Sequence, residues 1–169
     1  MSGQDAGTQA AAAEMPIEAC HALLREGRVG MLAMMSEEGP YAIPMAYGWD
    51  GAELWIGVSE GLKTRLLDAD PRCALTVWVA DGRDSWRSVI VAGTAYWAAT
   101  PEERMRGGEA LRRQHGGGAA APPPGPPPAS VDTPAAGGGA PASPPTKGRF
   151  SGGRMLLVRD ARITGRAKG

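Results

Sequence analysis

The sequence predicts a mainly β protein, a small barrel of six antiparallel strands with short helices at its openings. Three observations predict it. Short apolar stretches, several of them alternating with polar residues as strands do, recur along the chain. Turn signals such as Asp50-Gly51 separate neighbouring stretches, which favours hairpins. Helical signals occur in only three segments, so the helices are too few to follow every strand.

Size and composition narrow the class of protein. The 169 residues suffice for one domain with a hydrophobic core. Lysine plus arginine and aspartate plus glutamate number 18 each, so no basic excess indicates nucleic acid, and we expect small molecules or a second copy of the chain as partners. Neither an 18-residue apolar run nor a secretory signal is present, which predicts a soluble, cytoplasmic protein without membrane contact.

The cysteines and the N-terminal segment give less information about the class of protein. Cys20 and Cys73 stand on separate predicted elements with no metal-ligand spacing around them, so we expect two reduced, buried thiols and no metal site. Residues 1–14 are small and polar, and we expect a disordered tail. A helix then begins at Pro16 and ends at Gly27, with its inward positions at Ile17, Cys20, Leu23 and Leu24.

Three strands are predicted next, over residues 29–35, 41–49 and 53–58. Asp50-Gly51 is a two-residue hairpin signal between the second and the third. Pro44 lies inside the second strand and lacks an N–H group, so it predicts a sheet edge or a bulge. Ligands often approach a sheet at such a place, where the backbone is not fully paired.

A short helix between two strands, residues 59–70, is the central feature of the chain. We expect Ser59 to be its N-cap and Pro71 to end it. Gly61 and Lys63 beside free first-turn N–H groups can form an anion cradle, although Lys63 and Arg65 on the solvated face of a covering helix is the alternative. The inward stripe of this helix is expected at Leu62, Leu66 and Leu67.

The remaining elements complete the barrel. Strands are predicted over 72–79 and 86–97, the second with a bulge at Gly93, and Thr100 caps a polar helix that ends near His115. Residues 116–147 hold ten of the fifteen prolines and predict a disordered insert, a spacer or a docking segment. The folded domain therefore covers 15–115, and 148–169 supply a final strand, 154–167, and a tail.

The segment GPYAIPMAYGWDGAELWIGVSEGLKTRLLDADPRCALTVWV, followed by WRSVIVAGTAYW, resembles the pyridoxamine 5'-phosphate oxidase-like family of flavin-binding split barrels. The order and spacing of three short motifs, Gly61-Leu62-Lys63, Asp70-Pro71-Arg72 and Arg87-Ser88-Val89, carry the resemblance over residues 16–113. It implies a six-stranded antiparallel split β-barrel and a homodimer with FMN at the subunit interface.

The resemblance also implies site residues. Lys63 matches the phosphate-binding lysine of the family, flanked by Ser59 and Arg65. Ile43 and Pro44 match the segment beside the isoalloxazine ring, and Arg87 and Ser88 match positions that reach the cofactor from the long strand. No acid or base stands out as catalytic.

The sequence departs from the family at three places. Leu62 stands where relatives often have a basic residue, and Gly57 where the nitroimidazole-reductase-like branch usually has histidine. The last strand lacks the histidine that true pyridoxamine phosphate oxidases use, which disfavours that substrate.

Three functions remain open at this point. The first is an FMN-dependent oxidoreductase that transfers hydride or electrons to a small molecule, with an F420-dependent reductase of the same fold as its closest alternative. The second is a non-catalytic flavin or ligand scaffold that uses the insert for docking. The third is a barrel that has lost its cofactor.

Overall fold

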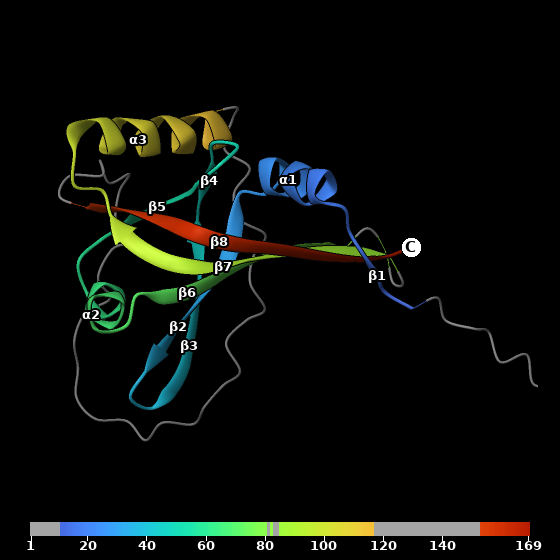
Figure 1. Ribbon diagram of the computed structural model, residues 1–169, viewed down its shortest axis with the longest axis horizontal. Helices are drawn as coiled ribbons and strands as arrows, with labels where there is room; N and C mark the ends of the chain where they lie inside the picture. The colour runs from blue at the N-terminus through green and yellow to red at the C-terminus, as the bar shows by residue number, and fades with distance from the viewer. Residues whose placement is uncertain (1–10, 81, 83–84, 117–152) are drawn as a thin grey trace, which may run out of the picture.

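The computed structural model of the chain describes residues 11–80, 82, 85–116 and 153–169. These residues form eight strands and three helices (Figure 1). The elements follow in the order β1 (Ala13–Glu14), α1 (Ile17–Glu26), β2 (Val29–Ser36), β3 (Gly39–Ala46), β4 (Gly48–Trp49), β5 (Leu54–Val58), α2 (Leu62–Ala69), β6 (Arg72–Ala80), β7 (Trp86–Trp97), α3 (Pro101–His115) and β8 (Arg154–Lys168).

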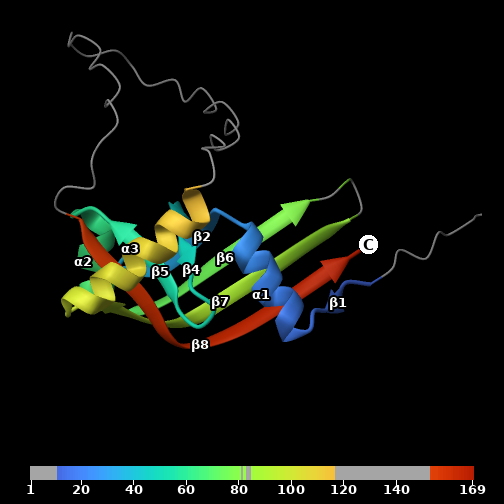
Figure 2. The same ribbon diagram turned by 90° about the horizontal axis from the view of Figure 1, so that it is seen from above.

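All strand pairs are antiparallel, in the order β3-β2-β6-β7-β8-β5-β4, and β1 adds to β8. The sheet curls into a half-barrel. Figures 1 and 2 show α1 and α3 along one side of the long β7–β8 pair and α2 near the end of β7. The mainly antiparallel split-barrel prediction is confirmed. The count of six strands is too low, because β1 and β4 are separate two-residue strands.

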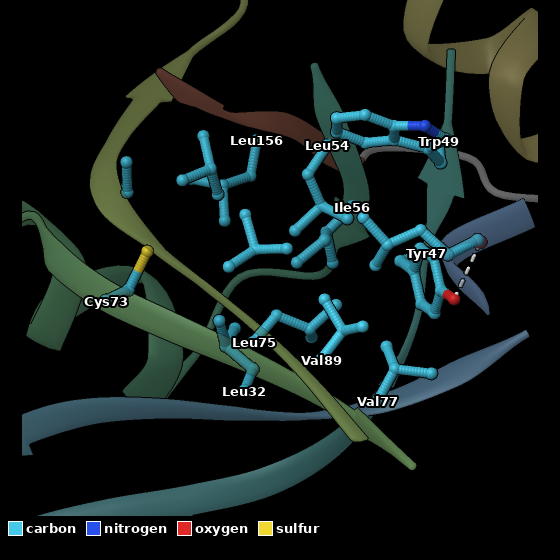
Figure 3. Close-up of a cluster of buried hydrophobic side chains, with 14 of the residues drawn as sticks. Leu32, Tyr47, Trp49, Leu54, Ile56, Cys73, Leu75, Val77, Val89 and Leu156 are labelled. Carbon is cyan, nitrogen blue, oxygen red and sulfur yellow. Dashed lines mark hydrogen bonds between the residues drawn. The ribbon is translucent and has the colours of Figure 1, made fainter. Parts of the chain in front are cut away.

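The core lies inside the curl of the sheet (Figure 3). On β6 the predicted alternation is confirmed, since Leu75 and Val77 are buried while Trp78 on the opposite face is 57% exposed. Leu32 of β2 lies opposite Leu75, and Val89 of β7 opposite Val77. Burial of each such aliphatic side chain contributes about 1.5–3 kcal/mol.

Two predicted backbone irregularities of the sheet are confirmed. β3, which carries Pro44, is one of the two edge strands of the described sheet. The β7–β8 register shifts between Ala92 and Thr94, around Gly93, where an added Cβ would lie 2.6 Å from the carbonyl oxygen of Arg159. The close approach of the two backbones leaves room for glycine alone at this position.

The region between β3 and β5 differs from its prediction. The expected strand over 41–49 is divided at Tyr47 into β3 and β4. The expected two-residue hairpin is a longer turn, because β4 ends at Trp49 and β5 begins at Leu54. Asp50 stabilises this turn by accepting hydrogen bonds from the main-chain N–H groups of Ala52 and Glu53. The turn therefore spans the four residues 50–53 and not Asp50-Gly51 alone.

The ends of α1 and α3 are as the sequence predicts. Gly27 follows α1, and its N–H donates to the carbonyl of Leu23. The Thr100 hydroxyl accepts from the N–H of Glu103 at 3.1 Å, and the Glu103 carboxylate accepts in return from Thr100 N.

Ion pairs hold α3 against the sheet. Arg106 contacts Asp50 at 2.8 Å and Glu53 at 3.0 Å, while Arg159 of β8 joins Glu53 at 3.2 Å to Glu103 at 2.7 Å. These contacts cross from α3 to the β4–β5 turn and to β8, so they fix the position of the helix relative to both.

Three further sequence predictions concern the cysteines, the N-terminal tail and the insert. Cys20 and Cys73 are buried, free thiols that form no disulfide. Ala13–Glu14 of the expected tail pair with β8, while residues 1–10 lie outside the described residues. The expected insert over 116–147 also lies outside them from residue 117 onward. In the part of the chain that the structure does describe, no helix is long and apolar enough to cross a bilayer.

Candidate functional site

A cavity of about 710 Å³ lies beneath α3. Its floor comes from the end of β5 and the start of β8, through Gly57, Val58 and Met155. Ala46, the last residue of β3, closes one side, and the cavity-facing residues of α3 form the roof. The volume is in the range that small-molecule sites occupy.

The space under α3 depends on small residues where the helix approaches the sheet. A Cβ added at Gly107 would lie 2.6 Å from the Trp55 ring and 2.8 Å from Met155, and one at Gly48 would lie 2.6 Å from the backbone of Ala110. Gly108, the next residue along, lines the cavity itself. The helix therefore lies close to β4 and β5 on one side and leaves the cavity open on the other.

α2 begins at Leu62, four residues after the cavity residue Val58. Its N-cap is Gly61 and not the expected Ser59, and no side chain caps the first-turn N–H groups. Gly61 has φ 155°, and no described atom lies within 4 Å of the place where a Cβ would stand. The backbone at this turn is therefore accessible from outside.

The contacts of Thr64 explain why Gly61 and not Ser59 is the N-cap of α2. Thr64 is 1% exposed, and its hydroxyl accepts from the N–H of Gly61 at 3.1 Å and lies 3.1 Å from a Glu60 carboxylate oxygen. Thr64 and Leu67 face inward, whereas Leu62 is 45% exposed, so the predicted inward position of Leu62 is wrong. Lys63 is half-buried, and Ser59 and Arg65 are exposed.

Arg154 connects the cavity to α2. Its guanidinium stacks 3.7 Å from the ring centroid of Trp97, donates to Asp68 at 3.1 Å and lies 3.9 Å from Glu60. Hydrogen bonds from Arg154 and from the Trp97 indole, the latter at 2.6 Å, lower the pKa of Asp68. Asp68 therefore stays a carboxylate and holds Arg154 at the rim of the cavity.

The predicted site residues fall into two groups. Ser59, Lys63 and Arg65 surround the start of α2, and Ile43 and Pro44 lie on β3, two to three residues before the cavity residue Ala46. The side chains of this strand alternate, since Ile43 lies opposite buried Leu32 whereas Pro44 is exposed. None of these predicted residues is among those that line the cavity, but Ala46 and Val58, which do line it, follow Pro44 and precede Ser59 closely in the chain.

Arg87 and Ser88 form the second group and are far from the first. They begin β7, whereas Trp97 at its other end is the residue that contacts α2. Nine residues of extended chain separate Ser88 from Trp97, which is about 30 Å. Arg87 contacts Glu26 at 3.5 Å, and Ser88 lines a smaller hollow of about 360 Å³ with Arg162 and Arg166. One chain does not bring the two groups together.

Sequence reasoning missed the residues on the cavity side of α3. Arg104, Gly108, Arg112 and His115 line the cavity, and so does Arg154 of β8. His115 also lies 2.8 Å, through Nε2, from the carbonyl oxygen of Tyr47. The spacing of 104, 108 and 112 places these positions on one helix face, which is the only signal that the sequence contained.

The antiparallel half-barrel with a cavity between its edge strand, β5 and a covering helix defines the split-barrel class. The chain belongs to the pyridoxamine 5'-phosphate oxidase family, whose sequence profile matches residues 16–134. A curated relative, an uncharacterized protein of Rhizobium meliloti (strain 1021), is 27% identical over 79 residues, 47% of this chain. The chain spans about half the length of that relative, 52%.

Solved structures share the fold at low sequence identity. An FAD-binding protein of Mesorhizobium loti has a TM-score of 0.64 at 18% identity, with 94% of this chain and 98% of that chain covered. An FAD- and heme-binding protein of Mycobacterium smegmatis has a TM-score of 0.63 at 17% identity, with 93% and 73% covered. At these identities the likeness establishes the fold alone.

Proposed function

We propose that this protein binds FMN and acts as an oxidoreductase that transfers hydride or electrons to a small molecule. Family membership and the FAD-binding neighbour from Mesorhizobium loti support a flavin. The single observation that carries the proposal is the cavity of about 710 Å³, which is lined by Ala46 at the end of the Ile43–Pro44 strand and by Val58, four residues before α2 begins. Both segments were assigned to the cofactor from the sequence.

The start of α2 fits a phosphate group. The uncapped first-turn N–H groups offer donors at the positive end of the helix dipole, and the half-buried Lys63 adds a full charge. Gly61 leaves the backbone open to close approach. The nearby Glu60 carboxylate opposes an anion, but it is turned toward Thr64 and Arg154.

The remaining residues of this region would orient the ring system. β3 is an edge strand, so its outer backbone groups are not paired within the sheet and can face a ligand. Val58 and Met155 offer apolar surface, and α3 excludes water from above. A bound flavin supplies the redox chemistry, which accounts for the lack of an evident acid or base.

A homodimer would reconcile the two separated groups of predicted residues. Arg87 and Ser88 of one subunit can reach a flavin held by the other subunit, although they are about 30 Å along β7 from their own α2. A row of small side chains on the outer face of the sheet is suited to this contact. Four alanines lie in register across it, from the edge strand inward: Ala42, Ala33, Ala74 and Ala92.

Titration of the full chain with FMN and, separately, with F420, followed for FMN by addition of NADH or NADPH and a nitroaromatic acceptor, tests the activity. Flavin uptake with bleaching on reduction and recovery on adding the acceptor is the expected result. Uptake of FMN without any redox exchange would support the scaffold function instead. Uptake of F420 alone would support the F420-dependent alternative, and uptake of neither cofactor would overturn the proposal.

A further inference from the structure

His115, the last residue of α3, lines the cavity beneath that helix. The other described residues of the lining are arginines, which keep their protons, and residues whose side chains carry no titratable group. Histidine is the type of side chain whose charge changes near neutral pH. Among the described residues that line the cavity, His115 is therefore the one that can both give and take up a proton.

The contact of His115 with Tyr47 determines which ring nitrogen carries a hydrogen. Nε2 lies 2.8 Å from the main-chain carbonyl oxygen of Tyr47. A carbonyl oxygen only accepts hydrogen bonds, so Nε2 must be the donor and must carry a hydrogen. In the neutral ring the lone pair is then on Nδ1, which has no hydrogen-bond partner among the residues that the structure describes.

Both sides of this contact are held in place. Tyr47 is fully buried, its hydroxyl donates to the carbonyl of Leu24 at 2.9 Å, and its main-chain N–H donates to the carbonyl of Arg28 at 3.3 Å. The side chain of Gln114 also donates to the Leu24 carbonyl, at 2.6 Å, and so ties the last turn of α3 to α1. The imidazole of His115 is therefore bound between a fixed carbonyl and a fixed helix end.

Both protonation states of His115 are compatible with the Tyr47 contact. In the imidazolium form both ring nitrogens carry a hydrogen, and in the neutral form Nε2 retains its own because the carbonyl requires a donor. The proton that is lost and regained is therefore the one on Nδ1, and the ring need not move. A histidine on an ordinary solvated helix end has no such constraint, since water can serve either nitrogen.

We propose that His115 donates the proton that completes the reduction of the small-molecule acceptor. The proposal rests on the proposed flavin function, since a proton donor has a role only where electrons are transferred. It goes beyond that function, which assigns no acid or base. A bound, reduced flavin supplies two electrons and one hydrogen as hydride. His115 supplies a proton from Nδ1 and regains it from solvent.

A nitroaromatic acceptor shows the balance of this step. Conversion of the nitro group to a nitroso group breaks one N–O bond and consumes one hydride and one proton. The nitrogen is reduced by two electrons, and the flavin is oxidised by two. The oxygen leaves as water, with one hydrogen from the hydride and one from Nδ1 of His115. The imidazolium becomes the neutral ring, with its Nε2 hydrogen still on the Tyr47 carbonyl.

His115→Gln tests the donor role, because the glutamine amide nitrogen can replace Nε2 as donor to Tyr47 while the titrating nitrogen is lost. The FMN-loaded full chain is reduced with NADH and then mixed rapidly with a nitroaromatic acceptor. FMN uptake and bleaching by NADH should be unchanged, since hydride transfer to the flavin needs no proton from the protein. Reoxidation by the acceptor should slow on the order of a hundredfold.

Two further variants separate proton donation from structural support. His21→Gln changes the other histidine, whose ring lies 5.3 Å from that of Trp49, and should leave reoxidation unchanged. His115→Ala removes the ring altogether, and added imidazole should restore part of its reoxidation rate without affecting the parent. Restoration by a free base of the same chemistry is expected of a proton donor and not of a structural residue.

The position of the hydrogen can also be measured without flavin or turnover. The chain has two histidines, so nitrogen NMR of the imidazole rings, assigned with His115→Gln, reports the tautomer of each. The neutral ring of His115 should carry its hydrogen on Nε2. A neutral ring with its hydrogen on Nδ1 would overturn the inference, because that nitrogen could not then take up a proton.

Failure of this inference differs from failure of the proposed function. A parent chain that passes electrons to the acceptor, with His115→Gln equally fast or with no effect of imidazole on His115→Ala, would overturn the donor role and leave the flavin function standing. A parent chain that takes up no FMN would overturn the proposed function and the donor role together.

Discussion

The side-chain amide of Gln114, in the last turn of α3, donates to the carbonyl of Leu24 in α1 at 2.6 Å, across 90 residues of sequence. The same amide nitrogen donates to the carbonyl of Gly27, and the amide oxygen of Gln114 accepts from Trp49 N at 2.9 Å. One side chain thus hydrogen-bonds the backbone carbonyls at the end of α1 and a backbone N–H of β4. It anchors the end of α3 that carries Arg112 and His115.

Replacing Gln114 with alanine should therefore lower the free energy of unfolding by about 2–3 kcal/mol, because part-buried carbonyl and N–H groups lose their partners. Gln114→Glu should be at least as harmful, since a carboxylate has no donor for the carbonyls of Leu24 and Gly27. Urea denaturation followed by circular dichroism measures both. A change below about 0.5 kcal/mol in both variants would show that this anchor is dispensable.

Two neighbouring glycines of α3 should respond to alanine in opposite directions. Gly107→Ala forces a methyl group to within 2.6 Å of the Trp55 ring and 2.8 Å of Met155, so it should destabilise the protein by about 1–3 kcal/mol. Gly108→Ala meets only the flexible end of Arg112 at 3.4 Å and should stabilise it by up to about 1 kcal/mol through helix propensity. Thermal melts of the two variants test the close approach of α3 to β5. Destabilisation by both, or by neither, would contradict it.

The two thiols should react slowly with Ellman's reagent at pH 8 in the folded protein and quickly in urea. Burial raises the pKa of Cys73 from 9.0 to about 11, and Cys20, 1% exposed, has a raised pKa for the same reason. The thiolate of Cys73 is then about one part in a thousand at pH 8. Rapid labelling of both thiols in the native state would show that the reagent can reach these positions in the folded protein.

The raised pKa of Cys73 also makes the stability of the folded protein depend on pH. The pKa of the Cys73 thiol is higher in the folded chain than the ordinary value of 9.0, so the folded state holds this proton more tightly. The stabilisation is present below about pH 9 and should be lost as the pH rises through about 11. Between about pH 9 and pH 11, a Cys73→Ser variant should lose less stability than the parent chain.

The proposed dimer predicts that a charge in the alanine row separates the subunits. Ala74 is central to the row and half-buried on the outer face of β6. Ala74→Arg should convert a particle of twice the 17.5 kDa chain mass into a monomer, as measured by light scattering after size exclusion. Ala52→Arg, in the exposed β4–β5 turn, is the control. A dimer that survives Ala74→Arg would place the interface elsewhere.

The sequence predicted elements that depend on local chemistry. Thr100 caps α3 because its hydroxyl needs only the N–H of Glu103, three residues away. Pro44 marked an edge strand because a missing N–H is tolerated there. Gly93 marked the bulge because it lacks a Cβ, although the group that requires this, the Arg159 carbonyl, lies on the neighbouring strand β8, which is distant in the sequence.

The errors have a local and a distant cause. Ser59 is a better N-cap than Gly61 by residue type, but Thr64 hydrogen-bonds Gly61 and turns inward beside the core. The cavity was missed because it exists only once α3 has crossed over β5 and the start of β8. Arg112 and Arg113 look alike in sequence, and only their different surroundings distinguish them.

The central claim is that the start of α2 holds the phosphate of a flavin, and a comparison of FMN with riboflavin tests it most directly. The fluorescence quenching of each flavin is titrated with the full chain, with Lys63→Ala and, as control, with Lys168→Ala at the end of β8. The parent and Lys168→Ala should bind FMN at least about tenfold more tightly than riboflavin, and Lys63→Ala should lose most of that preference. Equal affinities for FMN and riboflavin in the parent chain, or a preference that survives Lys63→Ala, would contradict the claim.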